Sequence, residues 1–173
     1  VGMIRGKLKS SGVSEPDFII VQDYDQLAIG PFQCEFLPVT HSTPSGLMTI
    51  FDTPQGLIVH SSDFKLDPAP IDNRLTDLAR LEELSVDPGI RLLLADSTNA
   101  DSPGFSASES EVGPAIQQVF EENGEQRIIV GVFSSHIHRI QQIADSADMT
   151  GRKLVVLGPS LIRNFSLARE LGL

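Results

Sequence analysis

The chain has four histidines, His41, His60, His136 and His138, and each follows an apolar run that predicts a β-strand. Open sheets place binding sites beyond strand ends, and neutral imidazole is a good ligand for zinc or manganese. Asp63 lies three residues after His60, and a carboxylate can bridge two such ions. Spacing alone favours ordinary turn or cap residues at these positions, because His before Ser-Thr-Pro and Asp after Ser-Ser are common in turns.

A second polar group, Ser134-Ser135-His136-Ile137-His138-Arg139, follows an apolar run and precedes a predicted helix. The N–H groups and dipole of a helix N-terminus attract phosphate, and hydroxyl, imidazole and guanidinium groups add further donors. On one helix His136 and His138 would lie about 200° apart, so both can face one point only if the helix begins between them. The coincidence favours an anion site over a simple serine N-cap with exposed histidines.

The elements that must position these residues fall into two parts of the chain with different predicted secondary structure. Before residue 62, β-like runs alternate with turns, and TPQG (53–56) predicts a hairpin. A helix with apolar residues at 3–4 spacing is predicted over 75–86, and an apolar strand buried on both faces over 90–96. The β-like runs are FIIVQ (18–22), EFLPVT (35–40), LMTIFDT (47–53) and GLIVHS (56–61).

After residue 104, helices alternate with apolar strands. Ser108-x-x-Glu111 predicts a capping box at the start of a helix. Buried strands are predicted over 127–133 and 153–158, and helices over 136–147 and 160–171. Such alternation is typical of a parallel sheet. The predicted fold class is therefore α/β, with a mixed β-rich layer over residues 1–104 and an open α/β unit over 105–173.

The composition is that of a globular protein. The chain has 173 residues, 40% of them hydrophobic, and no apolar run approaches the roughly 18–20 residues of a membrane span. The first residues contain no secretory signal. The single cysteine, Cys34, excludes an intrachain disulfide and a cysteine-based zinc cluster, and a reducing, cytoplasmic location is expected.

The net charge of −10 argues against binding of nucleic acid by bulk charge, since phosphate neutralisation requires Lys and Arg. The charge is unevenly spread, however. Residues 1–104 carry 7 basic and 15 acidic side chains, a net −8, whereas 105–173 carry 6 and 8, a net −2. Bulk charge therefore does not exclude a local phosphate site in the second part.

Five segments together resemble ribonuclease J, a branch of the metallo-β-lactamase nucleases that carry a β-CASP domain. They occur in that family's order and at close to its spacings, and they cover nearly the whole chain. The segments are THSTPSG (40–46), VHSSDFKLDPAPID (59–72), LLLADSTNADSPGFSASES (92–110), VFSSHIHRIQQIADSA (132–147) and GRKLVVLGPSL (151–161).

The resemblance implies roles for individual residues. His41 matches a metal-binding histidine and Asp63 the aspartate that bridges two metal ions. Asp96 matches the acidic residue of β-CASP motif A, and His138 the motif B histidine that faces the scissile phosphate. Asp63, Asp96 and His138 are thus the implied catalytic residues. Ser134, Ser135 and His136, together with His138, match the residues that hold a 5′-terminal phosphate.

The resemblance also implies the fold and the activity. Residues 1–104 would be the C-terminal portion of the first metallo-β-lactamase segment, an αββα sandwich, and 105–173 the N-terminal portion of the β-CASP domain. The family processes and degrades RNA with two divalent metal ions, zinc or alternatively manganese. It cuts internally and also 5′→3′ from monophosphorylated ends. A homodimer or homotetramer of the full-length protein and no membrane partner are expected.

Several departures from the family pattern accompany the resemblance. The motif His-x-His-x-Asp-His is not found, so the chain is expected to be an internal segment that is inactive alone. His136 stands where Asn is usual, GPSL (158–161) where GRSM is usual, and SSDF (61–64) where TGDF is more common.

Two other functions remain open. One is a non-catalytic RNA-binding or assembly subunit with the same fold, and the other is a β-CASP nuclease acting on other nucleic acids.

Overall fold

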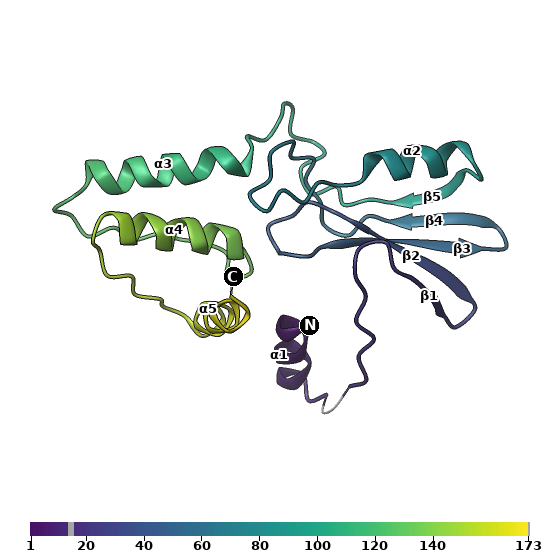
Figure 1. The fold of residues 1–173 in the computed structure, drawn as a ribbon, viewed down its shortest axis with the longest axis horizontal. Coiled ribbons are helices and arrows are strands. Elements are labelled where there is room, and N and C mark those ends of the chain that lie inside the picture. Colours follow the sequence, from purple (N-terminus) through teal and green to yellow (C-terminus); the bar gives the residue numbers. More distant parts are fainter. Residues whose placement is uncertain (14–15, 173) are drawn as a thin grey trace. The chain divides into compact units, whose positions relative to one another are not determined.

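The computed structural model describes residues 1–13 and 16–172, which form two compact units. One unit is Val21–Glu111, and the other joins Val1–Ile20 to Val112–Leu173 (Figure 1). No helix among the described residues is both long enough and apolar enough to cross a membrane.

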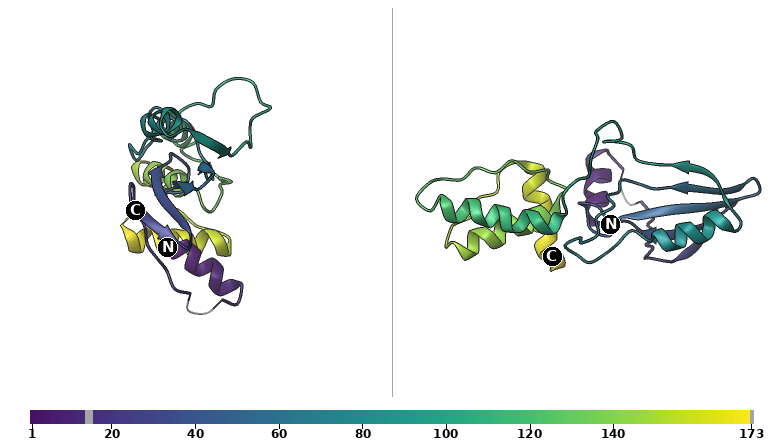
Figure 2. Two further views of the ribbon diagram at one scale, coloured as in Figure 1. Left: turned by 90° about the vertical axis from the view of Figure 1, so that its right-hand side faces the viewer. Right: turned by 90° about the horizontal axis from the view of Figure 1, so that it is seen from above.

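A five-stranded sheet forms the Val21–Glu111 unit, in the order β1-β2-β3-β4-β5. The first three pairings are antiparallel, whereas β4 and β5 are parallel and are connected through helix α2 (Leu78–Val86). Figure 2 shows α2 running alongside the strands. The predicted α/β class is confirmed as a mixed sheet. The strands are β1 (Gln26–Ile29), β2 (Phe32–Pro38), β3 (Leu47–Thr53), β4 (Gly56–His60) and β5 (Ile90–Leu94).

The hairpin predicted at 53–56 is confirmed. Thr53 pairs with Gly56, and the Thr53 hydroxyl donates to the Gly56 carbonyl oxygen at 2.7 Å. Gly56 has a φ of +115°, a conformation that glycine adopts without steric cost. Strand β3 has the predicted bounds, and β4 ends one residue early, at His60.

One face of the sheet packs against α2. Leu84 of α2 lies in a buried cluster with six strand or strand-end residues, and each is at most 6% exposed. The helix begins at Leu78 and not at residue 75 as predicted, because the Asp77 carboxylate accepts the Arg80 N–H and caps it. The six are Leu37, Val39, Met48, Ile50, Leu57 and Val59.

One strand prediction near the start of this sheet was wrong, and the strand predicted over 35–40 was shifted in its bounds. Residues 18–22 form no strand, and Ile19 and Ile20 are 72% and 63% exposed. The strand that pairs with β2 is instead β1, a more polar segment whose only described neighbour is β2. Strand β2 ends at Pro38, since proline has no N–H to continue the ladder.

Strand β5 is less buried than predicted. It pairs only with β4 among the described residues, so it lies at the sheet edge. Leu92, Leu93 and Leu94 are 46%, 57% and 48% exposed. The prediction of burial on both faces was therefore wrong for the described chain, because an apolar run indicates a surface suited to burial without supplying the element that covers it.

The other unit is built on helices. Helix α4 (Ile137–Met149) packs on α3 (Glu109–Glu122) through Phe120, Ile143 and Ala147. Helices α4 and α5 (Pro159–Leu171) share a second buried cluster of Ile137, Ile140 and Ala168. Helix α1 (Gly2–Ser10) contacts α5. Pro159 is at the first turn of α5, where its fixed φ suits a helix start.

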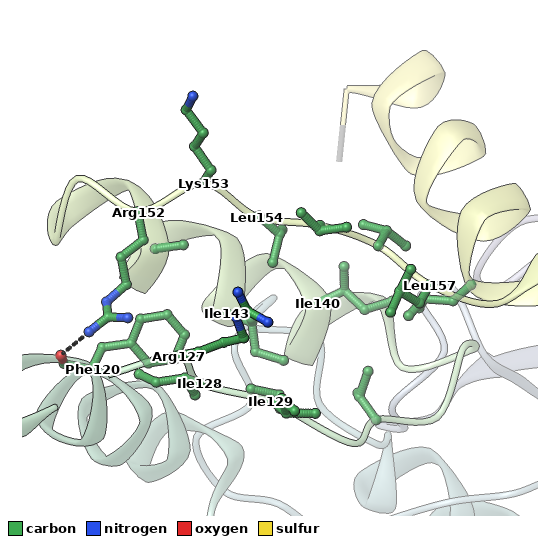
Figure 3. A pocket seen from close by; sticks show the side chains of 16 residues that line it. Phe120, Arg127, Ile128, Ile129, Ile140, Ile143, Arg152, Lys153, Leu154 and Leu157 are labelled. Atoms are coloured by element: carbon green, nitrogen blue, oxygen red, sulfur yellow. Dashed lines mark hydrogen bonds between the residues drawn. The ribbon is translucent and has the colours of Figure 1, made fainter. Parts of the chain in front are cut away.

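The strands predicted over 127–133 and 153–158 were wrong for the described residues, since neither segment has strand pairing. Both segments instead line an apolar pocket of about 590 Å³ beside α4 (Figure 3). Ile129, Val155 and Leu157 are 89%, 73% and 78% exposed. Both segments have the apolar composition that is typical of buried strands. A strand also requires a hydrogen-bonding neighbour, which the described residues do not supply.

Candidate functional site

Three of the predicted site residues follow strands that end at one edge of the sheet. Strands β2 and β4 both run antiparallel to β3, and β5 runs parallel to β4, so β2, β4 and β5 point the same way. His41 follows the end of β2, Asp63 the end of β4 and Asp96 the end of β5. This edge is where an open sheet gathers ligand-binding side chains.

Hydrogen bonds join the three loops at that edge. The Ser61 N–H donates to the Leu94 carbonyl oxygen at 3.0 Å, and the Asp96 N–H donates to the Ser61 hydroxyl oxygen at 3.0 Å. The Lys65 N–H donates to the Thr40 carbonyl oxygen at 2.8 Å. The loop that carries Asp63 is therefore attached to the residue before His41 and to the backbone of Asp96.

The loop before His41 is held from its other side as well. The Thr40 hydroxyl donates to the Arg74 carbonyl oxygen at 2.7 Å, and Thr40 is 5% exposed. The Arg74 guanidinium donates to the carbonyl oxygens of Val39 and Gly46 at 3.1 and 2.6 Å and also binds the Asp23 carboxylate. These bonds fix the backbone that presents His41.

The Asp96 carboxylate is stabilised in its ionised form. The pKa of Asp96 lies below its ordinary value chiefly because the Thr98 hydroxyl and N–H donate to it, at 2.6 and 3.0 Å. The Phe64 N–H and the electrostatic interaction with His41 lower the pKa of Asp96 further, and together these effects outweigh desolvation. Asp96 thus interacts both with His41 and with Phe64, the residue after Asp63.

The side chains at this edge differ in exposure. His41 and Asp96 are partly buried, whereas Asp63 and His60 are exposed. The His60 Nδ1 accepts the Ser62 N–H at 3.3 Å. Within residues 1–13 and 16–172, no three His, Cys, Asp or Glu side chains come together as a metal site. The described donors fit zinc or manganese in kind, as imidazole and carboxylate, and are a partial set in number.

The predicted phosphate-binding residues lie in the helical unit, around the start of α4. The helix begins at Ile137, between His136 and His138, which is the condition under which both histidines can face one point. The N-cap is His136 rather than a serine, because its Nδ1 accepts the Arg139 N–H at 3.3 Å. With Nδ1 as acceptor, a neutral His136 ring carries its proton on Nε2.

Ser134 and Ser135 form the turn that leads into α4. The His136 N–H donates to the Phe133 carbonyl oxygen and the Ile137 N–H to the Ser135 carbonyl oxygen, both at 3.0 Å. The buried amide of Asn164 on α5 donates to the Ser134 carbonyl oxygen at 2.8 Å. Ser135 is exposed, and Ser134, His136 and His138 are partly buried. The structure therefore brings these four predicted residues to one turn.

The capping box predicted at the start of α3 was wrong in its partners. The Ser108 hydroxyl donates to the Asp67 Oδ1 at 2.7 Å, and the Glu109 N–H donates to the Asp67 Oδ2 at 2.8 Å. A residue more than forty positions away thus caps α3. Sequence reasoning missed Asp67, although Asp-Pro at 67–68 is a signal for the turn in which the Ala69 N–H donates to the Asp67 Oδ1.

Comparison with known proteins matches the chain to one family. The family described as "Ribonuclease J, beta-CASP domain" matches residues 125–173. Ribonuclease J of Mycolicibacterium smegmatis is 40% identical over 172 residues, which is 99% of this chain and 30% of that protein. The resemblance to ribonuclease J is confirmed. Ribonuclease J of Mycobacterium tuberculosis (strain CDC 1551 / Oshkosh) is 43% identical over 157 residues, which is 91% of this chain and 28% of that protein.

Ribonuclease J of Thermus thermophilus is 37% identical over 99% of this chain and 30% of its own length. The chain therefore spans about 30% of the curated ribonuclease J relatives it matches. The fold is also similar to a solved structure titled "Crystal Structure of a Protein of Unknown Function from Enterococcus faecalis V583". That match has a TM-score of 0.57 at 16% identity and covers 92% of this chain and 46% of that chain.

Proposed function

We propose that these 173 residues are a segment of a metal-dependent ribonuclease that processes and degrades RNA. The similarity to ribonuclease J over 99% of the chain supports this proposal, together with the placement of His41, Asp63 and Asp96 at one sheet edge. The activity has both an internal mode and a 5′→3′ mode from monophosphorylated ends. The segment alone is inactive.

His41 and Asp63 are the proposed metal ligands within this chain. Neutral imidazole and carboxylate suit zinc and also manganese, and a carboxylate can bridge two ions. The hydrogen bond between Lys65 and Thr40 supports a shared site, since it attaches the Asp63 loop to the His41 loop. The bound ions supply Lewis-acid activation of water and of the phosphate, and further ligands complete their coordination.

Asp96 holds a fixed negative charge beside these ligands. Its lowered pKa keeps the carboxylate ionised, and the Thr98 and Phe64 donors orient it. An oriented, ionised carboxylate next to a cationic site can accept a proton or hold a protonated partner without rearranging at the moment of reaction. We assign it the acidic role that β-CASP motif A has in the family.

His138 is the residue proposed to face the scissile phosphate. Ser134, Ser135 and His136 hold the terminal 5′-phosphate, with hydroxyl and imidazole donors at the N-terminus of a thirteen-residue helix. The His136 Nδ1 accepts the Arg139 N–H at the start of the helix, so a neutral His136 ring carries its proton on Nε2. An imidazole can bind phosphate by donating such a proton, and histidine stands here where the family pattern has asparagine.

The domain organisation, cellular location and oligomeric state follow from the same proposed family role. Residues 1–104 belong to the αββα metallo-β-lactamase portion, and 105–173 to the β-CASP portion. The protein acts in the cytoplasm as a homodimer or homotetramer, on RNA.

The test uses the complete polypeptide encoded by the gene that carries these residues. Wild-type protein should cleave 5′-monophosphorylated RNA, and removal of divalent metal by a chelator should abolish cleavage. His138→Ala should lower kcat by about 100-fold or more, the usual scale for loss of an acid–base group, with unchanged thermal unfolding. Gln141→Ala, at an exposed position of the same helix, is the matched control and should retain cleavage.

Two results would contradict the proposal. Retained cleavage in His138→Ala would refute the role of that histidine. RNA binding by wild-type protein without any metal-dependent cleavage would favour the non-catalytic RNA-binding function instead.

A further inference from the structure

Asp67 is a buried carboxylate four residues after the proposed metal ligand Asp63. The residue is 4% exposed, and its side chain is fully buried. A buried carboxylate is costly unless it is hydrogen-bonded and paired, so its partners indicate what it is for.

The described partners of Asp67 lie in two segments of the Val21–Glu111 unit, residues 65–69 and residues 108–109. Its Oδ1 accepts the Ser108 hydroxyl at 2.7 Å and the Ala69 N–H at 3.0 Å. Its Oδ2 accepts the Glu109 N–H at 2.8 Å, and the Lys65 Nζ lies at 3.5 Å. The carboxylate thereby ties residues 65–69 to residues 108–109.

Lys65 extends this connection in two directions. Its ammonium donates to the Ala107 carbonyl oxygen at 2.6 Å and to the Glu109 Oε1 at 3.3 Å. Its backbone N–H donates to the carbonyl oxygen of Thr40, the residue before His41. One continuous set of bonds thus runs from the His41 loop through the Asp63 loop to the segment 107–109.

We infer that Asp67 is a positioning residue that holds the Asp63 loop, and through Lys65 the His41 loop, in the arrangement needed to bind metal. This inference rests on the proposed function. Asp67 touches neither ligand side chain, and it acts by anchoring the backbone that carries them. Groups that hydrogen-bond a metal ligand directly change metal affinity by about 10- to 100-fold, and the lower end of that range is expected for a residue that acts through the backbone.

The test compares Asp67→Ala and Asp67→Asn with wild type in the complete gene product, with titration calorimetry of Zn²⁺ and Mn²⁺ as the main readout. Asp67→Ala should weaken metal affinity about 10-fold or more and raise the metal concentration needed for half-maximal cleavage. Cleavage at saturating metal should recover most of the wild-type rate. Asp67→Asn should weaken affinity less, because the amide retains one acceptor oxygen. Asp52→Asn, at an exposed position of β3, is the matched control and should bind metal as wild type does.

A partner variant keeps the inference testable if Asp67→Ala does not fold. Ser108→Ala removes one donor to Asp67 without changing the carboxylate, and it should weaken metal affinity in the same direction by a smaller factor. Lowered thermal stability with wild-type metal affinity in both the Asp67 and Ser108 variants would show that Asp67 is only a structural residue. Wild-type protein that binds no metal would instead refute the proposed function, and with it this role.

Discussion

The Ser62 hydroxyl donates to the Leu47 carbonyl oxygen at 2.7 Å, across the start of β3 and the end of β4. Ser62 has a φ of +56°, in the left-handed region that favours glycine, and it directly precedes Asp63. The hydrogen bond to Leu47 therefore offsets part of the backbone strain that serine introduces next to the proposed metal ligand.

Substitutions at Ser62 should separate these two contributions. Ser62→Ala keeps the strain and loses the hydrogen bond, so it should lower the free energy of unfolding by about 1 kcal/mol. Ser62→Gly loses the same bond but relieves the strain, which is about 1–2 kcal/mol for a non-glycine residue in this conformation. Urea unfolding should therefore rank Gly above Ala, and the opposite order would contradict the offset.

The ionised Asp67 carboxylate should make the free energy of unfolding of the Val21–Glu111 unit depend on pH in acid. Desolvation would raise the pKa of Asp67, but the donors from Glu109, Ser108 and Ala69 and the charge of Lys65 outweigh it and lower the pKa from 3.8 to about 2. A carboxyl whose pKa is depressed on folding stabilises the fold above its unfolded pKa, and this contribution is lost as the pH falls. Asp67 should thus contribute on the order of 2 kcal/mol that disappears between about pH 4 and pH 2.

Denaturant unfolding at several pH values measures this contribution. Asp67→Asn should be less stable than wild type at pH 7 and should lose less stability on acidification. Asp52→Asn should follow the wild-type profile. Equal acid sensitivity in wild type and Asp67→Asn would disprove the role of this carboxylate.

Arg152 is predicted to stabilise the helical unit and not to bind RNA. Its guanidinium donates to the Gln126 carbonyl oxygen at 2.7 Å and to the Asn123 carbonyl oxygen. It also lies 5.6 Å from the centroid of the Phe120 ring, and Figure 3 shows Arg152 beside that ring. The Asn123 carbonyl directly follows the C-terminal end of α3, where a cation is favourable, and the Gln126 carbonyl lies three residues further on.

Arg152→Ala should therefore lower the unfolding free energy by about 1–3 kcal/mol, as expected for lost hydrogen bonds to a charged group. Lys153→Ala removes the same charge at the adjacent, exposed position and should change stability little. Circular dichroism during thermal unfolding distinguishes the two variants. A larger loss of stability in Lys153→Ala would overturn this assignment.

The apolar pocket beside α4 should bind a hydrophobic dye. Ile129, Val155 and Leu157 are largely exposed around a volume of about 590 Å³. An apolar pocket with exposed aliphatic side chains around it offers a binding site for a hydrophobic probe. The 173-residue chain should therefore enhance the fluorescence of 8-anilinonaphthalene-1-sulfonate under native conditions. The double variant Ile129→Lys, Val155→Lys should reduce this signal, whereas Glu125→Lys should not, and an unchanged signal in the double variant would place the dye elsewhere.

The elements best predicted from the sequence were those whose local signals and partners are close along the chain. LMTIFDT became β3 with the predicted bounds, because its partner β4 follows a two-residue turn. The helix over 136–147 was also predicted closely, since its apolar residues recur at helical spacing and pack on α3 and α5.

The errors share a physical origin. Runs 127–133 and 153–158 have the composition of buried strands, but pairing depends on a neighbour that composition does not reveal. The site residues also differ in how far their signals extend along the chain. Strand ends indicated His41, Asp63 and Asp96, whereas Asp67 was missed because its partners Ser108 and Glu109 lie more than forty residues away. The metal, phosphate and catalytic roles of the site residues stay predictions.

Among the described residues, strand β5 pairs only with β4, so its other backbone edge is unpaired there, beside three exposed leucines. Strand β5 contains no lysine or proline, although its register with β4 shifts between Ile90 and Leu92, and an exposed edge of this kind is a template on which another strand can add. When the 173 residues are produced alone, we expect this edge to limit the concentration at which the protein stays in solution. Aggregation should begin there by strand addition while the fold itself is intact.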